Sequence, residues 1–434
     1  MRSEGQKTGN VFFNRNFRLV FLGALVSELG ALLYNFAVSF YILEISGNSA
    51  FLQGLYLALC GISMLVFTPI GGVLGDRCSK AKIMVVCDFL KGGMILLATV
   101  LMLLFPLPEA HLAVLFSLGI AGNAVSGVFN PAAGALFPHI VAEEQLQQAN
   151  AFFSMKSSME SILGIILAGI LYAALQIHTL FFLVGACFVA SGISEMLIRY
   201  DHIPPKDRLT LKLALADMRE GITYLKTKKA ILAILGAVLF INFFIEPVTG
   251  NFLPYFIKSD LSAAPSYLLD SVLTPELWAS VFSVCFGISS LLGAALLSAR
   301  PQQEKVGHKT ALRLCVTGAV MIALTVCYWL FVDRGISMNG FLIALCLDGL
   351  ATGFLISIVN IPLNTAMMRI VDRDKLSKVT SIISIGSQGM IPIASVLAGL
   401  VLQTLGSTPL LLACSLGFTV MALWMLANRH VREI

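Results

Sequence analysis

Long apolar runs alternate with short polar segments along almost the whole chain. An α-helix rises about 1.5 Å per residue, so a run of about 20 residues can cross the roughly 30 Å hydrocarbon core of a bilayer. The pattern therefore predicts membrane-spanning helices rather than the amphipathic helices of a soluble domain. The twelve expected spans are 17–44, 51–75, 82–106, 111–135, 147–175, 179–199, 230–257, 277–299, 310–332, 338–363, 378–403 and 407–427.

The composition agrees with this pattern. Only 12% of the 434 residues are charged and 57% are hydrophobic, with a mean hydropathy of +0.87. A soluble domain of this length needs a more charged surface. We therefore expect an all-α polytopic membrane protein. The first apolar run, 17–44, is too long for the apolar region of a signal peptide and predicts a retained span.

The nine cysteines lie almost all inside apolar runs, with no C-x-x-C pair and no histidine cluster. They are expected to be packing residues rather than disulfides or metal ligands. We accordingly expect no metal and no other cofactor.

Lysine and arginine predict the orientation of the spans. With the N-terminus in the cytoplasm, the outward loops contain only Lys258 and Arg334 as basic residues, and almost all others fall on the inner side. We therefore expect a cell-membrane protein with both termini cytoplasmic. The net charge of +5 then reflects a basic inner rim that faces anionic membrane lipid, not a nucleic-acid partner.

The spans divide into two halves that resemble each other. We expect one six-helix bundle at 1–199 and a second at 230–434. Residues 200–229 are expected to form a cytoplasmic linker that contains an amphipathic helix. Residues 130–171 align without a gap on residues 360–401, at a constant offset of 230, with matches such as Asn130/Asn360 and Leu146/Leu376. Duplicated halves with a site at their interface are typical of transporters.

The segment "GGVLGDRCSKAK" at 71–82 follows the second span and resembles the loop motif G-x-L-A-D-R-x-G-R-K of the major facilitator superfamily. Gly72, Leu74, Asp76 and Arg77 match it. Further segments resemble the macrolide-efflux and siderophore-exporter branch of the drug:proton antiporters in that superfamily. They are "NFRLVFLGALVSELG" at 16–30, "FNPAAGALFPHIVAEEQLQQANAF" at 129–152, "MREGITYLKTKKAI" at 218–231 and "NIPLNTAMMRIVDRDKLSKVTS" at 360–381. The resemblance implies the major facilitator fold, with two pseudo-symmetric bundles of six transmembrane helices.

The resemblance also implies a cytoplasmic gate. The family's matching aspartate is a gate residue, so this role is expected of Asp76, which could sit against the positive N-terminal end of the eleventh span. Glycines before it would let two helices approach closely. The alternative is a set of solvated positive-inside charges. The candidate gate residues are Gly72, Asp76, Arg77, Lys80, Asp88 and Lys91.

Ionisable side chains inside apolar runs are costly and predict functional sites. Four carboxylates qualify, and all lie on spans that line the central cavity in the superfamily. Each can carry a proton across or neutralise a lipophilic cation; helix–helix pairing is the structural alternative. Lys156 precedes Glu160 by one turn and predicts a neutralised pair. The candidate proton-coupling and substrate-binding residues are Glu28, Glu246, Asp348, Glu160, Lys156, Tyr34, Asn242 and Asn360.

The fifth span departs from the antiporter pattern G-P-x-x-G-G, because residues 164–169 are "GIILAG". Gly164 and Gly169 keep the close-packing role, whereas Ile165 removes the bend that the proline would produce.

We expect a secondary active transporter that exports amphiphilic, drug-like small molecules by alternating access, coupled to protons by antiport and working as a monomer. The alternative is a uniporter or symporter of a lipid-like, siderophore or bile-acid-like amphiphile; a non-transporting scaffold is more remote. An enzyme is not expected. The sequence has no ATP-binding G-x-x-x-x-G-K-[ST], no H-E-x-x-H motif and no repeated channel filter.

Overall fold

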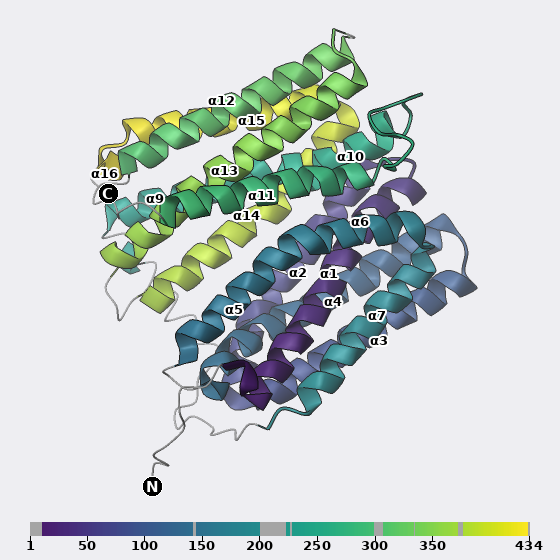
Figure 1. The fold of residues 1–434 in the computed structure, drawn as a ribbon, viewed down its shortest axis with the longest axis vertical. Helices are drawn as coiled ribbons and strands as arrows, with labels where there is room; N and C mark the ends of the chain where they lie inside the picture. Colours follow the sequence, from purple (N-terminus) through teal and green to yellow (C-terminus); the bar gives the residue numbers. More distant parts are fainter. Residues whose placement is uncertain are drawn as a thin grey trace. The chain divides into compact units, whose positions relative to one another are not determined.

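The computed structural model describes residues 11–141, 145–199, 223–225, 228–298, 307–333, 335–371 and 376–432. Within these ranges every regular element is helical (Figure 1). Among the described residues, eleven helices are long and apolar enough to cross a membrane, and a twelfth contains the shorter apolar segment Gln388–Thr404. The expected all-α fold of twelve spans is confirmed.

The chain divides into two compact units whose boundary does not follow the middle of the sequence. Unit 1 comprises Met1–Val38 and Ile62–Ala214, and unit 2 comprises Ser39–Gly61 and Leu215–Ile434. The last part of the first helix and the first part of the second therefore belong with the C-terminal half of the chain.

The division into 1–199, 200–229 and 230–434 stays a prediction. Most of the expected linker, including nearly all of its amphipathic helix, lies outside the described residues.

Unit 1 is built from the first six spans, apart from residues 39–61. Its elements are η1 (Val11–Phe13), α1 (Arg15–Ile45) up to residue 38, α2 (Ala50–Arg77) from residue 62, α3 (Lys80–Leu104), α4 (Pro108–Ile140), α5 (Leu146–Met159), the π-helical turn η3 (Glu160–Gly164), α6 (Ile165–Ala174) and α7 (Ile177–Met196).

Helices α3 and α7 of unit 1 run side by side and approach closely at small residues (Figure 1). A side chain at Gly92 would bring its Cβ to 2.9 Å from Val189 Cγ2, and one at Gly185 would bring it to 2.7 Å from Leu96 Cγ. In lipid, where the hydrophobic effect does not drive helices together, such close backbone approach supplies the packing energy.

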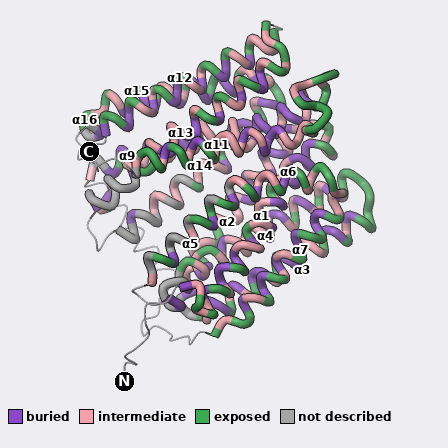
Figure 2. The backbone as a smooth tube through the Cα atoms, in the orientation of Figure 1, coloured by how far each residue is buried: buried purple, intermediate pink, exposed green. Residues whose placement is uncertain are grey.

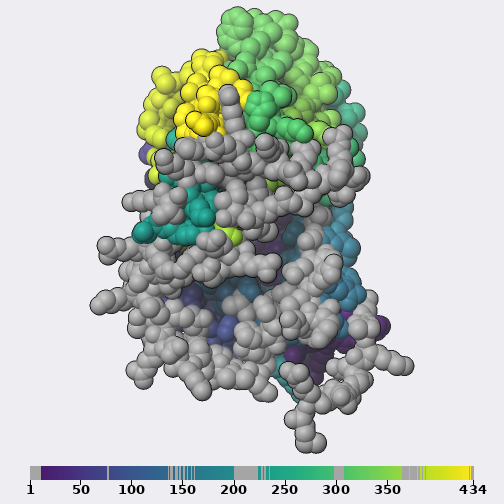
Figure 3. Space-filling view, turned by 90° about the vertical axis from the view of Figure 1, so that its left-hand side faces the viewer, coloured from purple at the N-terminus to yellow at the C-terminus, as the bar shows by residue number. Residues whose placement is uncertain are grey.

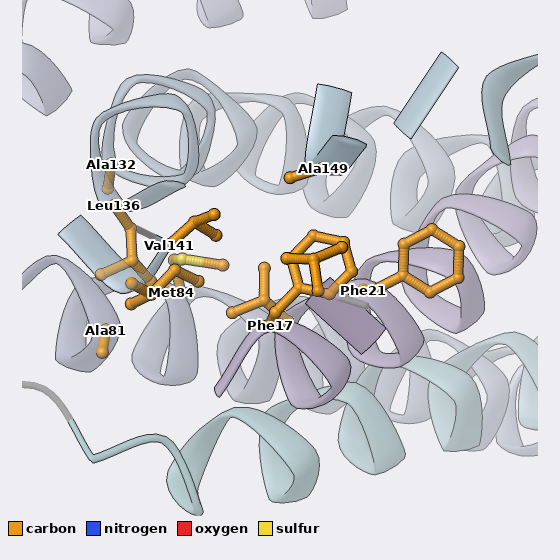
Figure 4. Close-up of a cluster of buried hydrophobic side chains, with 11 residues drawn as sticks. Phe17, Phe21, Ala81, Met84, Ala132, Leu136, Val141 and Ala149 are labelled. Atoms are coloured by element: carbon orange, nitrogen blue, oxygen red, sulfur yellow. The ribbon is translucent and has the colours of Figure 1, made fainter. Parts of the chain in front are cut away.

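One end of unit 1 contains an aromatic core. Figure 4 shows Phe17 and Phe21 on α1 in one cluster of buried side chains with Met84 of α3 and Leu136 of α4. Phe152 of α5 packs against both phenylalanines, with ring centroids 6.1 Å away in each case. The start of α1 is thereby fastened to α3, α4 and α5.

Unit 2 contains residues 39–61 and the last six spans. Its further elements are α9 (Lys229–Glu246), the π-helical turn η4 (Pro247–Phe252), α10 (Leu253–Phe256), the π-helical turn η5 (Ile257–Leu261), α11 (Leu277–Ser298), α12 (Gly307–Val332), α13 (Met338–Ile370), α14 (Leu376–Thr404), α15 (Ser407–Ala427) and α16 (Arg429–Arg432). Helix α16 contacts α12, and Figure 3 shows yellow residues near the C-terminus beside green residues of the same unit.

The seventh span runs from α9 to η5 and is interrupted by wide turns. Pro247 has no backbone N–H, so the regular hydrogen bond of an α-helix is absent there and the helix widens into η4. This turn directly follows Glu246.

Residues 50–61 of α2 pack closely on α14 within unit 2. A Cβ added at Gly61 would lie 2.7 Å from Pro392 Cγ, and one at Gly399 would lie 2.5 Å from the carbonyl oxygen of Ala50. The fully buried Gln53 donates from Nε2 to Ser39 Oγ at 2.7 Å and to the carbonyl oxygen of Gly250 at 3.3 Å.

The proposed internal repeat also appears in the helix boundaries. α4 ends at Ile140 and α13 at Ile370, while the following helices begin at Leu146 and Leu376. Both boundaries are offset by 230 residues, as the sequence alignment requires.

Large apolar side chains on the outer helix faces remain exposed, as lipid-facing residues are. Leu103, Leu292 and Val420 are 59%, 61% and 65% exposed. Figure 2 shows exposed positions (green) recurring along helices that also contain buried ones (purple).

Candidate functional site

The most tightly connected charges of unit 1 lie where α1 meets α5. Lys156 on α5 is 2% exposed, and its Nζ lies 2.5 Å from Glu28 Oε2 on α1 and 3.5 Å from Glu160 Oε1. Glu28 remains 51% exposed, whereas Glu160 is buried. The structure thus joins three candidate residues in one cluster, with Lys156 closer to Glu28 than to its helical neighbour.

The local backbone around this cluster is irregular. Glu160 is the first residue of η3, the π-helical turn that ends at Gly164. π-helical turns inside α-helices occur frequently at functional sites. A side chain at Gly164 would bring its Cβ to 3.0 Å from Leu29 Cδ2 of α1, so this glycine lets α1 approach the fifth span.

The close-packing role expected of Gly164 and Gly169 agrees with these contacts, since Gly169 is also buried. The proline bend is absent, and the chain has a wide turn immediately before Ile165 instead.

A charge count describes what the cluster can bind. Two carboxylates and one ammonium leave one negative charge when all three groups are ionised. A buried uncompensated charge is costly, so the cluster favours one further positive charge. A proton or the cationic group of a ligand would supply it, with the half-exposed Glu28 as the reachable member.

Lys91 of α3 lines a separate cavity of about 80 Å³ in unit 1. Tyr34, Asn35, Asn123 and Ser126 contribute polar groups to the cavity. The Tyr34 ring also packs against Phe181, with centroids 5.3 Å apart. Tyr34 is therefore a wall residue of this cavity.

The structure describes the side chains of only some of the candidate gate residues. Asp76 and Arg77 lie on the last turn of α2, but their side chains lie outside the described part of the structure. A Cβ added at Gly72 would meet no atom within 4 Å, whereas Gly71 approaches α4, with a built Cβ 2.6 Å from Val128 Cα. Lys80 is a buried residue that begins α3.

Asp348 of α13 lines a cavity of about 30 Å³ in unit 2, together with Thr249, Thr325 and Thr352. Asp348 Oδ1 and Thr352 Oγ1 are buried and have no hydrogen-bond partner among the described residues. Buried polar groups usually have partners. The volume is enough for about two water molecules, at roughly 10–15 Å³ each.

The other candidates of unit 2 lie apart from this arrangement or at its edge. Glu246 precedes η4, and a side chain at Gly250 would bring its Cβ to 2.8 Å from Glu246 Oε1. Asn242 donates from Nδ2 to the carbonyl oxygen of Val238 at 3.1 Å, within its own helix. Asn360 lies on an exposed face of α13.

Two charge groups were not predicted as sites. Lys258 of η5 lies 3.0 Å from Glu44 Oε2 and 2.9 Å from Glu276 Oε1. Glu195 of α7 is 1% exposed, and Lys91 lies within its electrostatic range. The signal for Glu195 was present in the sequence, since it is a lone carboxylate near the end of an apolar run.

Comparisons with known proteins place this chain in a family. The sequence model described as Major Facilitator Superfamily matches residues 20–395. The chain is 24% identical over 328 residues to YkuC, an uncharacterized MFS-type transporter of Bacillus subtilis (strain 168), covering 73% of this chain and 71% of that protein. It is 23% identical over 281 residues to macrolide efflux protein A of Streptococcus pyogenes, covering 65% of each.

Solved structures agree on the fold. The crystal structure of the nucleoside transporter NupG (D323A mutant) aligns with a TM-score of 0.74 at 13% sequence identity, covering 94% of this chain and 99% of that one. The chain belongs to the Major Facilitator Superfamily and is a multi-pass membrane transporter of small molecules.

Proposed function

We propose that this transporter exports amphiphilic, drug-like molecules in exchange for protons, by alternating access. The chain would lie in the cell membrane with both termini cytoplasmic, because almost all basic loop residues then face inward. It would work as a monomer. Its similarity to macrolide efflux protein A supports export of this kind of compound.

The cluster of Glu28, Lys156 and Glu160 carries the proposal. Lys156 is 2% exposed, while Glu28, its 2.5 Å partner, is half-exposed and therefore accessible to both protons and substrate. A cluster with one net negative charge binds one positive charge at a time. Proton and cationic substrate would then exclude each other, which is the requirement for antiport.

The sequence of events follows from this competition. A proton on Glu28 would weaken its bond to Lys156 and neutralise the cluster, which then no longer attracts a cationic substrate. Loss of the proton would restore the attraction. Asp348 and Glu246 are further candidates for proton coupling, and Asp76 would act in the cytoplasmic gate.

A flux measurement tests the proposal. The purified protein is placed in liposomes with an imposed pH gradient, and luminal pH is followed after addition of a macrolide or a lipophilic cation. Wild type should give substrate-dependent proton flux, and Glu28→Gln and Glu160→Gln should each reduce it at least tenfold. Glu109→Gln serves as the matched control, because Glu109 is an exposed residue in the first turn of α4.

Two results would contradict the proposal. Proton flux that persists in both cluster variants would remove the cluster from the coupling. Substrate movement without any pH change would indicate uniport, or symport with another ion, and would leave the transporter assignment intact.

A further inference from the structure

Three ionisable side chains lie together where α3 packs against α7 in unit 1. Asp88 and Lys91 are one turn apart on α3, and Glu195 lies on α7. Asp88 is 0% and Glu195 is 1% exposed. Lys91 interacts electrostatically with both carboxyl groups. The three side chains form a compact charged group, which we call the α3–α7 cluster.

The carboxyl groups of this cluster lack hydrogen-bond donors. All four carboxyl oxygens of Asp88 and Glu195 are buried without a partner among the described residues. Ser191 of α7 lies near Asp88, but its hydroxyl donates to the carbonyl oxygen of Gly23 at 3.0 Å. Buried carboxylates usually accept several hydrogen bonds. Two fully ionised carboxylates in this position would therefore be poorly stabilised.

The ammonium of Lys91 is held by aromatic rings instead of a direct ion pair. It lies 4.9 Å from the ring centroid of Phe129 and 5.3 Å from that of Phe188. No carboxylate oxygen within the described ranges forms a salt bridge with it. Cation–π contacts stabilise its positive charge while leaving its ammonium protons available.

Lys91 connects the cluster to a cavity that has room for water. It lines the cavity of about 80 Å³ described above, as do Asn123 and Ser126 of α4. At roughly 10–15 Å³ per water molecule, this volume holds several waters. Water in this cavity would contact Lys91, which interacts electrostatically with both buried carboxyl groups.

The charges of the surroundings determine what the cluster binds. Cys87 of α3 lies beside it, and Glu28 of α1 lies within electrostatic range of Lys91. Glu28 is itself paired with Lys156 of α5. Two carboxyl groups and one lysine are electrically neutral only when the carboxyl groups together hold one proton.

We propose that Asp88 and Glu195 form a proton-binding site that holds one proton between them beside Lys91, and that exchanges this proton with water in the neighbouring cavity. The proposal deepens the proposed proton-coupled function, because it adds a second proton site to unit 1. It differs from the cluster of Glu28, Lys156 and Glu160 in binding no substrate, since its carboxyl groups are fully buried.

Infrared spectroscopy of the full chain in liposomes at neutral pH tests this site without substrate or gradient. Protonated carboxyl groups give a C=O band that is separate from the bands of carboxylates. Relative to wild type, the C=O band of Glu195→Gln should be weaker by the intensity of one protonated carboxyl group, because the remaining Asp88 is ionised and neutralised by Lys91. The band of Lys91→Met should be stronger by the same amount, because both carboxyl groups then bind protons.

The double variant Lys91→Met/Glu195→Gln is the matched control for folding. In this variant Asp88 has no lysine beside it and binds a proton, so the C=O band should have the same intensity as in wild type. The two single changes, in contrast, should alter that intensity in opposite directions. The wild-type band should also shift on transfer to D₂O, because cavity water exchanges the proton.

A band that stays the same in both single variants would overturn the proposal, as would a band that does not shift in D₂O. Because this readout involves no transport, it separates the site from the exporter assignment. Loss of antiport with the expected band changes would refute only the proposed function.

Discussion

Lys258 joins residues 39–61 to the rest of unit 2, and its removal should loosen that connection. Its ammonium bonds Glu44 of α1 at 3.0 Å and Glu276 at 2.9 Å. Asn48, in the turn between α1 and α2, donates to the carbonyl oxygen of Lys258 at 3.5 Å. Lys258→Met keeps most of the length of the side chain and removes both ion pairs.

The two ion pairs differ in their expected strength. Lys258 and Glu276 have side chains only 13% and 15% exposed, so their charge-assisted bond should contribute about 2 kcal/mol. Glu44 is 54% exposed, and an exposed pair contributes at most about 1 kcal/mol. Only the Glu44 pair connects Lys258 to residues 39–61, because Lys258 and Glu276 both belong to the rest of unit 2. Loss of the Glu44 pair therefore changes the opening equilibrium of that segment by a factor of at most about five.

Thiol labelling measures this opening. The nine native cysteines are replaced, and Gln53→Cys places one thiol at a position with 0% exposure next to Ser39 and Gly250. Lys258→Met should increase its labelling rate by a maleimide up to about fivefold. Glu44→Gln should give a similar increase, and Glu276→Gln a smaller one, because its ion pair lies within the rest of unit 2.

Lys309→Met is the control, since Lys309 is exposed on α12. An unchanged labelling rate in Lys258→Met would refute the reasoning. An increase for Glu276→Gln as large as that for Glu44→Gln would refute the assignment of the Glu44 pair as the connection.

Two further predictions concern stability. Gly353→Ala should lower the thermal unfolding temperature, because its Cβ would meet the backbone carbonyl of Phe286 and Ser289 Oγ of α11. Gly93→Ala is the control and should leave this temperature unchanged, because the space around Gly93 is open. Equal melting curves for the two variants would contradict the prediction. Asn14→Ala should destabilise the protein by about 1–2 kcal/mol, because Asn14 Oδ1 accepts from the backbone of Asn16 and Phe17 at the start of α1 and its Nδ2 donates to the Ile140 carbonyl. In thermal unfolding, Asn14→Asp, which keeps the capping oxygens, should lose less; an equal loss would count against the capping role.

The sequence was sufficient to predict the fold because its strongest signal is length. Apolar runs such as 338–363 are long enough to span a bilayer, and the observed helix Met338–Ile370 contains that run. The repeat was also visible, since Leu146 and Leu376 both begin helices. These features depend on local sequence alone.

The partners of buried charges were harder to predict. Sequence spacing indicated Lys156 with Glu160, four residues later, but Lys156 lies closer to Glu28 on another helix. Each span is apolar on nearly all of its faces, so the hydrophobic periodicity of the sequence does not show which face packs against a neighbouring helix. Glu195 was visible in the sequence as a lone carboxylate, but its partner was not, because only the packing of α7 on α3 brings it to Lys91.

The wide turns could be anticipated only in part. Pro247 indicated a disturbance after Glu246, and the helix does widen there. η3 contains no proline, and its five residues from Glu160 to Gly164 have no sequence signal that distinguishes them from a regular helix.

The most direct test of the account is proton release on substrate binding. A macrolide is added to the purified transporter in weakly buffered solution, and released protons are counted per bound macrolide. Competition at the cluster of Glu28, Lys156 and Glu160 predicts proton release on macrolide binding in wild type and in Glu109→Gln, and none in Glu28→Gln. Macrolide binding without proton release in wild type, or with the same release in Glu28→Gln, would contradict the account.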